Sequence, residues 1–154
     1  MDIWEVFKKR KSARSFDPKI KISEEQLTKI LAAGKQAPSA GRIYPVDFFV
    51  VNSKEDKKKI AEAANNQNFL IEASLIIVVV ANVEKSASYY GERGRSLYAI
   101  QDAAAATENM ILATVALGLA TCWVGAFDED LVREALGLNG GERPLTILPI
   151  GQEK

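Results

Sequence analysis

Arg10, Ser12 and Arg14 stand two residues apart in the sequence, a spacing that could gather their side chains on one side of the chain. In an extended segment alternate side chains point the same way, so two guanidinium groups and a hydroxyl would converge on one anion, with Lys11 beside them. The same residues also fit a solvated basic turn. Spacing alone therefore leaves two interpretations open, an anion site and a solvated turn.

Two further segments combine small and aromatic residues. Residues 37–45, Ala-Pro-Ser-Ala-Gly-Arg-Ile-Tyr-Pro, form a loop whose small side chains would let a flat ligand approach the backbone closely. Residues 122–128, Cys-Trp-Val-Gly-Ala-Phe-Asp, bring a strand end to a helix start, where free backbone amides could meet a ligand. A rigid connection in the first and a tight turn in the second remain open as purely structural alternatives.

Composition excludes several classes of function. The 154 residues contain no histidine and one cysteine, so the usual zinc ligand sets, Ser-His-Asp and Cys-His catalysis and an internal disulfide are all excluded. Twenty basic residues balance twenty acidic ones, which provides no overall field for nucleic acid or an anionic membrane. No metal site, P-loop, dinucleotide fingerprint or secretory signal is present. We expect one domain over residues 1–154, located in the cytoplasm.

Capping signals and hydrophobic periodicity predict an α+β fold with a mixed sheet flanked by helices. The predicted helices cover residues 3–10, 23–34, 54–64, 97–119 and 128–137. The predicted strands cover residues 47–52, 75–81, 121–125 and 145–150. Residues 84–96 are predicted to be a polar loop, and Lys57, Lys58 and Lys59 to lie mostly on a solvated helix face. Acidic residues within 97–119 favour a central helix buried by protein over a membrane span.

In their order along the chain, these segments resemble the FMN-dependent nitroreductase family, and the resemblance covers nearly the whole sequence. Its landmarks are Arg10-x-Ser12-x-Arg14-x-Phe16, Ala37-Pro38-Ser39-Ala40, Gln101-Asp102-Ala103-Ala104-Ala105, and Trp123-Val124-Gly125-Ala126-Phe127-Asp128. The form Pro38-Ser39-Ala40-Gly41-x-x-Tyr44-Pro45 is similar to a branch that includes thiazoline and oxazoline dehydrogenases, in a small stand-alone version.

The resemblance implies a homodimer with FMN at the subunit interface and the long helix pairing with its symmetry mate. Arg10 and Ser12 would hold the phosphate and ribityl chain, with Lys11 as a further cofactor-binding residue, and Arg14 would lie near the pyrimidine edge of the ring. Pro38, Ser39 and Ala40 would come from the partner subunit and face the ring. The remaining expected cofactor residues are Arg42, Asn66, Gln67, Val124, Gly125, Ala126 and Lys154. Tyr44, Tyr90 and Arg93 are expected to contact substrate.

The implied activity is ping-pong reduction of nitro compounds, quinones or similar small acceptors by NAD(P)H, with the chemistry carried by FMN and no protein nucleophile. Three alternatives stay open: an FMN-dependent dehydrogenase of thiazoline or oxazoline type, a flavin-binding module without turnover, and a dimer that has lost FMN. Two departures from the family pattern bear on them. Arg42 replaces the usual loop asparagine, and Lys154 is the only basic residue in the last few positions to stand in for the family's cationic pair.

Overall fold

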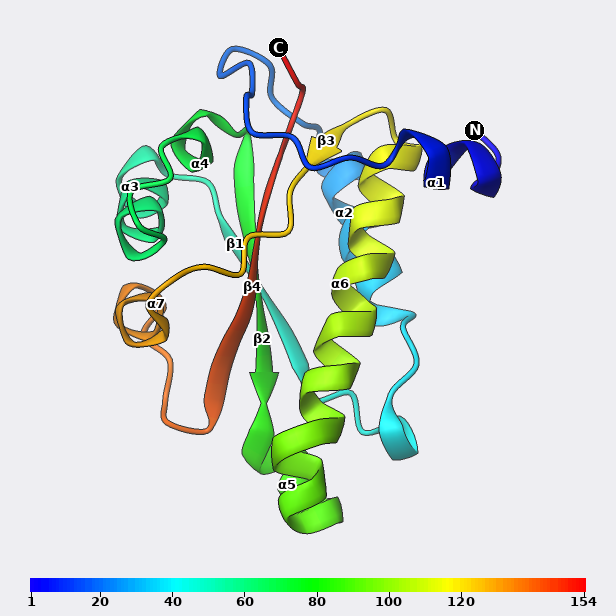
Figure 1. Cartoon of the computed structure of the whole chain (residues 1–154), viewed down its shortest axis with the longest axis vertical. Helices are drawn as coiled ribbons and strands as arrows, with labels where there is room; N and C mark the ends of the chain where they lie inside the picture. Colours follow the sequence, from blue (N-terminus) through cyan, green and yellow to red (C-terminus); the bar gives the residue numbers. More distant parts are fainter.

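A four-stranded sheet forms the centre of the computed structural model, which describes residues 1–154 (Figure 1). The strand order is β1-β2-β4-β3, and every pair of neighbouring strands is antiparallel. The strands are β1 (Val46–Val51), β2 (Leu75–Asn82), β3 (Ala120–Thr121) and β4 (Glu142–Gly151). The α+β class is confirmed. The sheet is mixed only through an isolated parallel bridge between Ser12 and Thr121.

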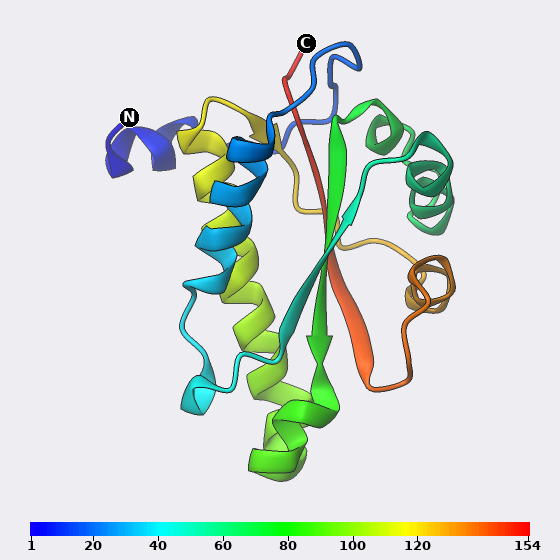
Figure 2. The ribbon, with the colours of Figure 1, turned by 180° about the vertical axis from the view of Figure 1, so that it is seen from behind.

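Helices cover both faces of the sheet (Figures 1 and 2). Strand β2 is apolar up to its last residue, Asn82, and its other seven residues are buried, as expected for a strand covered on both sides. Its alternate residues face two separate cores: Ile76, Val78 and Val80 belong to one, and Ile77 and Val79 to the other. Helices α3 (Lys54–Ala63), α4 (Phe69–Glu72) and α7 (Glu129–Leu136) pack on the first core, and α2 (Glu24–Lys35) and α6 (Ala99–Ala116) on the second.

Helix ends follow the capping signals of the sequence. The capping boxes Asp2–Glu5 and Ser23–Gln26 form at the starts of α1 (Ile3–Lys9) and α2. Asp128 caps α7, and Gly137 ends it with φ of 65°. The central helix α6 keeps nine buried residues. No helix has the combination of length and apolar character that crossing a membrane requires.

Three expectations need correction. Residues 84–96 are not a polar loop: α5 (Val83–Arg93) and a π-helical turn, η2 (Gly94–Tyr98), occupy them. The Asn82 side chain caps α5, and Arg95 bonds Glu84 and Glu92, so local polar contacts support this helix. Strand β3 ends at Thr121, four residues earlier than predicted.

The third correction concerns Lys57, which lies on the buried side of α3 with an exposed fraction of 5%. Its ammonium group donates a hydrogen bond to the carbonyl of Ala73 at 2.7 Å. The aliphatic stem of a lysine is long enough to cross an apolar layer and reach such an acceptor. The other two lysines, Lys58 and Lys59, are exposed as expected.

Candidate functional site

The segment carrying Arg10, Ser12 and Arg14 is extended and fixed at both ends. The amide of Ala13 donates to the carbonyl of Thr121 at 2.9 Å, and the amide of Asp17 donates to the carbonyl of Gln152 at 2.9 Å. Ala13 and Phe16 are buried, whereas the three candidate side chains are exposed. Buried residues therefore anchor the segment and leave the three polar side chains outside, and of these Arg10 and Ser12, but not Arg14, line a cavity beside it.

A cavity of about 130 Å³ lies beside this segment. Arg10, Lys11 and Ser12 line it together with Glu108 and Ile111 of α6 and with residues 121–123. The hydroxyl of Thr121 is buried in this wall and has no hydrogen-bond partner. A buried polar atom without a partner is costly, so the Thr121 hydroxyl is a candidate partner for a polar ligand. The guanidinium of Arg10 forms no ion pair within the chain, although the Lys11 ammonium bonds Glu153 at 2.7 Å.

A second element of the site is formed where residues 65–67 meet the turn after Val124. The side-chain amides of Asn65 and Gln67 both donate to the carbonyl of Ala126 at 3.3 Å. The backbone amides of Gly125 and Ala126 donate to no group in the chain, so two free donors lie at this exposed turn. Val124 differs, because it is buried and bonds Ile147 through both its amide and its carbonyl.

Asn66 lies in the turn that follows α3, with φ of 57°, and its side chain is exposed. Its neighbour Asn65 has the same φ and was not among the expected site residues. Two consecutive asparagines after a helix are the signal that could have identified it, since asparagine tolerates the left-handed conformation better than most residues.

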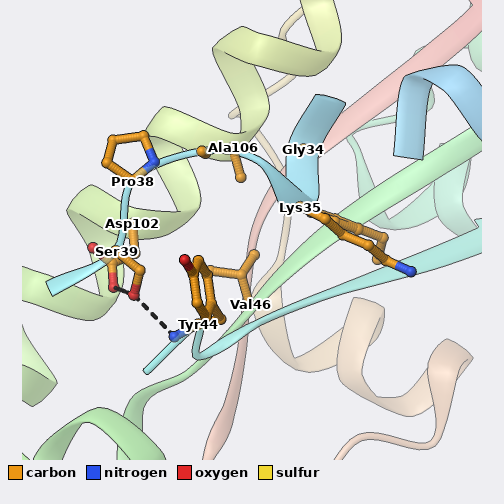
Figure 3. A pocket seen from close by; sticks show the side chains of 10 residues that line it. Gly34, Lys35, Pro38, Ser39, Tyr44, Val46, Asp102 and Ala106 are labelled. Atoms are coloured by element: carbon orange, nitrogen blue, oxygen red, sulfur yellow. Dashed lines mark hydrogen bonds between the residues drawn. The ribbon is translucent and has the colours of Figure 1, made fainter. Parts of the chain in front are cut away.

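The loop at residues 38–44 forms the third element. The hydroxyl of Ser39 donates to Asp102 Oδ2 at 2.7 Å, and the amide of Ala40 donates to Asp102 Oδ1 at 3.2 Å. The amide of Tyr44 donates back to Ser39 Oγ at 2.9 Å (Figure 3). Pro38, Ser39, Tyr44 and Asp102 line a cavity of about 190 Å³ between α2, β1 and α6.

The same loop has an unusual backbone. Gly41, Arg42 and Tyr44 all have positive φ, at 60°, 55° and 52°. Such angles are unfavourable for arginine and tyrosine and are found where the surrounding structure enforces them, often at functional sites. The guanidinium of Arg42 is exposed and forms no ion pair.

The expected substrate residues divide between two environments. Tyr44 is half exposed at the mouth of the larger cavity. The Tyr90 hydroxyl lies against Gly41, and a side chain at Gly41 would collide with it, so α5 contacts the loop directly. Arg93 is instead held by Tyr98: its Nε donates to the Tyr98 hydroxyl at 3.0 Å, and its guanidinium lies 5.3 Å from the ring centroid.

Lys154 is also engaged. Its ammonium forms an ion pair with Glu72 at 3.1 Å, and this hydrogen bond holds the pKa of the Glu72 carboxyl below its ordinary value. The pair fastens the end of the chain to α4 and to the Arg14 segment, where the amide of Phe16 also donates to Glu72 at 3.5 Å.

Within one chain these elements lie at two separate places. The Arg10 cavity and the Ser39 cavity share no lining residue. In Figure 1, α1 lies beside the upper end of α6, and the short turn η1 (Ala40–Arg42, cyan) lies near its lower end. A single chain therefore does not bring all the predicted residues together.

Comparison with known proteins identifies the fold and family. The model of the nitroreductase family matches residues 7–69 and 63–152. The chain belongs to the nitroreductase family. An Archaeoglobus fulgidus protein named as an NADH dehydrogenase/NAD(P)H nitroreductase is 35% identical over 94% of this chain and 82% of its own length. The sequence resemblance is thus confirmed at the level of the family, and this chain is an oxidoreductase.

Solved nitroreductase structures agree with this assignment. A nitroreductase family protein from Clostridium novyi superposes with a TM-score of 0.91 at 33% identity, covering 100% of this chain and 86% of that one. An FMN-dependent nitroreductase from Clostridium difficile superposes with a TM-score of 0.84 at 28% identity, covering 97% and 86%. The similarity of the Tyr44-Pro45 loop to thiazoline dehydrogenases stays a prediction.

Asp102 is the main residue of this nitroreductase chain that the sequence-based site prediction missed. In the sequence Asp102 belongs to a landmark of the long helix and argues against a membrane span. A signal was present, since Asp102 is an acidic residue followed by four alanines, and a carboxylate in such a helix needs donors from another segment.

Proposed function

We propose that this nitroreductase-family chain forms a homodimeric FMN-dependent oxidoreductase that uses NAD(P)H to reduce small planar acceptors such as nitro compounds or quinones. Bound FMN would supply the hydride transfer, taking it from NAD(P)H and passing it to an acceptor in a ping-pong cycle. The observation that carries the proposal is the Arg10 cavity, which Arg10, Lys11 and Ser12 line together with Thr121, whose buried hydroxyl has no partner.

The residues of this half-site fit the cofactor. Arg10, Ser12 and Thr121 offer cationic and hydroxyl groups for a phosphate and a polyol chain. Arg14 follows on the same extended segment, and its guanidinium would favour negative charge on the pyrimidine edge of the ring. The free amides of Gly125 and Ala126 would donate to the ring system, with Asn66 and Gln67 alongside. Val124 would fix the end of the strand, and Lys154 would hold the segment through Glu72.

Dimerisation supplies the other half-site. Gln101, Ala104, Ala105, Glu108 and Leu112 follow one face of α6 at helical spacing, and none of them is buried. Helix α1 adjoins this face and exposes Ile3, Trp4 and Phe7, with exposed fractions of 50%, 74% and 50%. Contiguous exposed apolar side chains of this size mark an association surface.

A twofold axis across α6 would pair the two copies of the helix antiparallel. Asp102 and Glu108 lie six residues apart, about 9 Å along the helix. A twofold axis midway between them would bring Asp102 of one chain level with Glu108 of the partner, and the reverse. Residues 38–42 of one chain would then face the Arg10 cavity of the other. This pairing joins the two half-sites and accounts for their separation within one chain.

Subunit complementation tests the shared site. Arg14→Ala damages one half-site, and Ala40→Trp blocks the loop of the other. Each homodimer is expected to bind FMN weakly, whereas mixing the two variants through co-expression restores roughly one quarter of the sites, since half the dimers are mixed and each has one intact site. Mixed dimers that bind no more FMN than either parent would contradict a site built from two chains.

The direction of the reaction is tested separately on the FMN-loaded protein under argon. Loss of the flavin absorption on addition of NADH, followed by faster return with a quinone than with air alone, supports the reductase. A flavin that NADH does not bleach favours the dehydrogenase alternative. A flavin that NADH bleaches and that no acceptor reoxidises faster than air favours a binding module without turnover.

A further inference from the structure

Asp102 is a buried carboxylate of α6 that four alanines follow, and its exposed fraction is 7%. Burying a carboxylate is unfavourable unless donors satisfy it. Both donors here come from one loop, the hydroxyl of Ser39 and the amide of Ala40, at 2.7 and 3.2 Å. Asp102 therefore ties α6 to a loop more than sixty residues away in sequence.

The hydroxyl of Ser39 is fully used as a donor. A serine hydroxyl has a single proton to donate, and this one is given to Asp102. Its oxygen also accepts from the amide of Tyr44 at 2.9 Å, which closes residues 39–44 into a ring. The Ser39 side chain thus has no proton left for a ligand.

These three hydrogen bonds hold a loop that would not adopt this shape alone. Arg42 and Tyr44 are in the left-handed region, which costs an ordinary residue about 1–2 kcal/mol. The loop nevertheless leaves donors free, because the amides of Ser39 and Gly41 bond no group in the chain. The loop therefore keeps two main-chain donors without a partner beside the exposed guanidinium of Arg42.

We propose that Asp102 is a positioning residue for the flavin site: it holds the loop at residues 39–44 so that main-chain amides, rather than the Ser39 hydroxyl, face the cofactor bound by the partner subunit. This inference rests on the proposed function, and it changes the role of Ser39 from a ligand of the cofactor to a link between Asp102 and the loop.

A double-mutant cycle on FMN affinity tests the proposal, using Ser39→Ala, Asp102→Asn and the double variant. Because both residues act through one hydrogen bond to a charged group, each single variant is expected to weaken FMN binding about tenfold. The double variant is expected to bind FMN no more weakly than the single variant that has the lower FMN affinity. If the two losses multiply instead, the Ser39 hydroxyl contacts the cofactor independently and the proposal is wrong.

The absorption spectrum of the bound flavin separates positioning from a general loss of stability. At saturating FMN, Asp102→Asn is expected to shift the flavin bands, because the amide donors near the ring move. A variant that merely unfolds part of the protein lowers occupancy and leaves the spectrum of the bound fraction unchanged. An unshifted spectrum would therefore overturn the positioning role.

Asp56→Asn is the matched control. Ser53 donates to Asp56 Oδ2 at 2.7 Å and accepts from the Asp56 amide at 3.0 Å, which is a similar serine–aspartate pair on the exposed start of α3. This variant is expected to leave FMN affinity unchanged. An equal loss in the control would show that the effect at Asp102 is not specific.

Ala40→Pro provides a second variant that leaves the buried carboxylate intact. It removes only the amide donor to Asp102, and Ser39, with φ of −136° and ψ of 140°, already has the backbone that precedes proline. Hydrogen exchange of the Tyr44 amide in the FMN-free protein is expected to accelerate in both Asp102→Asn and Ala40→Pro. Unchanged exchange would refute the hold on the loop, whereas failure of the wild type to bind FMN would refute only the proposed function.

Discussion

Replacing Thr121 by valine should stabilise the FMN-free protein and weaken FMN binding at the same time. Valine has the same branched shape as threonine and exchanges only the hydroxyl for a methyl group. The Thr121 side chain is 1% exposed, and its hydroxyl has no partner. Most substitutions in a binding site lower affinity or stability together, so opposite changes would identify this hydroxyl as reserved for a ligand.

The size of both effects follows from the burial of that hydroxyl. A buried hydroxyl without a partner costs about 1–3 kcal/mol in proteins, and we expect Thr121→Val to recover about 1 kcal/mol of it. For a chain of this size that raises Tm by about 2–4 °C. Loss of one neutral hydrogen bond to the cofactor costs about 0.5–1.5 kcal/mol, a two- to twelvefold rise in the FMN dissociation constant.

Thermal unfolding of the FMN-free protein and fluorescence titration with FMN measure the two quantities. Thr114→Val is the control, because the Thr114 hydroxyl is equally buried and donates to the carbonyl of Met110 at 2.7 Å. It should bring no stabilisation and no change in FMN affinity. A Thr121→Val protein that is less stable than wild type, or that binds FMN with unchanged affinity, would refute the reasoning.

Three further predictions concern other parts of the molecule. Arg14→Ala should weaken FMN binding by about 1.5–3 kcal/mol in a flavin titration, and an unchanged curve would remove this assignment. Burial, with a smaller effect from Lys21, lowers the pKa of the Lys57 amine from its ordinary value near 10.5. The unfolded chain therefore binds more protons than the folded one between the lowered pKa and 10.5, so the free energy of unfolding should rise with pH across that window. The rise should be smaller in Lys57→Met, and parallel curves of unfolding free energy against pH for the two proteins would contradict this. Trp4→Glu with Phe7→Glu should yield monomers in sedimentation that bind FMN poorly, and a stable dimer would exclude α1 from the interface.

The sequence predicted the elements whose cause is local. Asp2 with Glu5 and Ser23 with Gln26 carry their capping partners within three residues, so the helix starts follow from short-range chemistry. The apolar run at 75–81 predicted a strand covered on both faces for the same reason. The alternation of polar residues from Arg10 to Arg14 also needed only an extended backbone.

What the sequence did not predict depends on distant partners. Asp102 becomes part of the site only because Ser39 and Ala40 fold against it, and nothing near Asp102 in sequence reveals that contact. The polar residues of α5 predict a loop, whereas in the structure Arg95 reaches back eleven residues to bond Glu84 and supports a helix. Sequence places Lys57 on the solvated face, and nothing within α3 reveals its acceptor, the Ala73 carbonyl, which lies beyond the helix.

The most direct test of a flavin site shared by two chains is the visible absorption spectrum and the mass of the protein after incubation with FMN and gel filtration. The proposal predicts a dimer that retains flavin and loses its absorption when NADH is added under argon. A protein that elutes colourless after reconstitution, or a monomer that retains FMN fully, would contradict it.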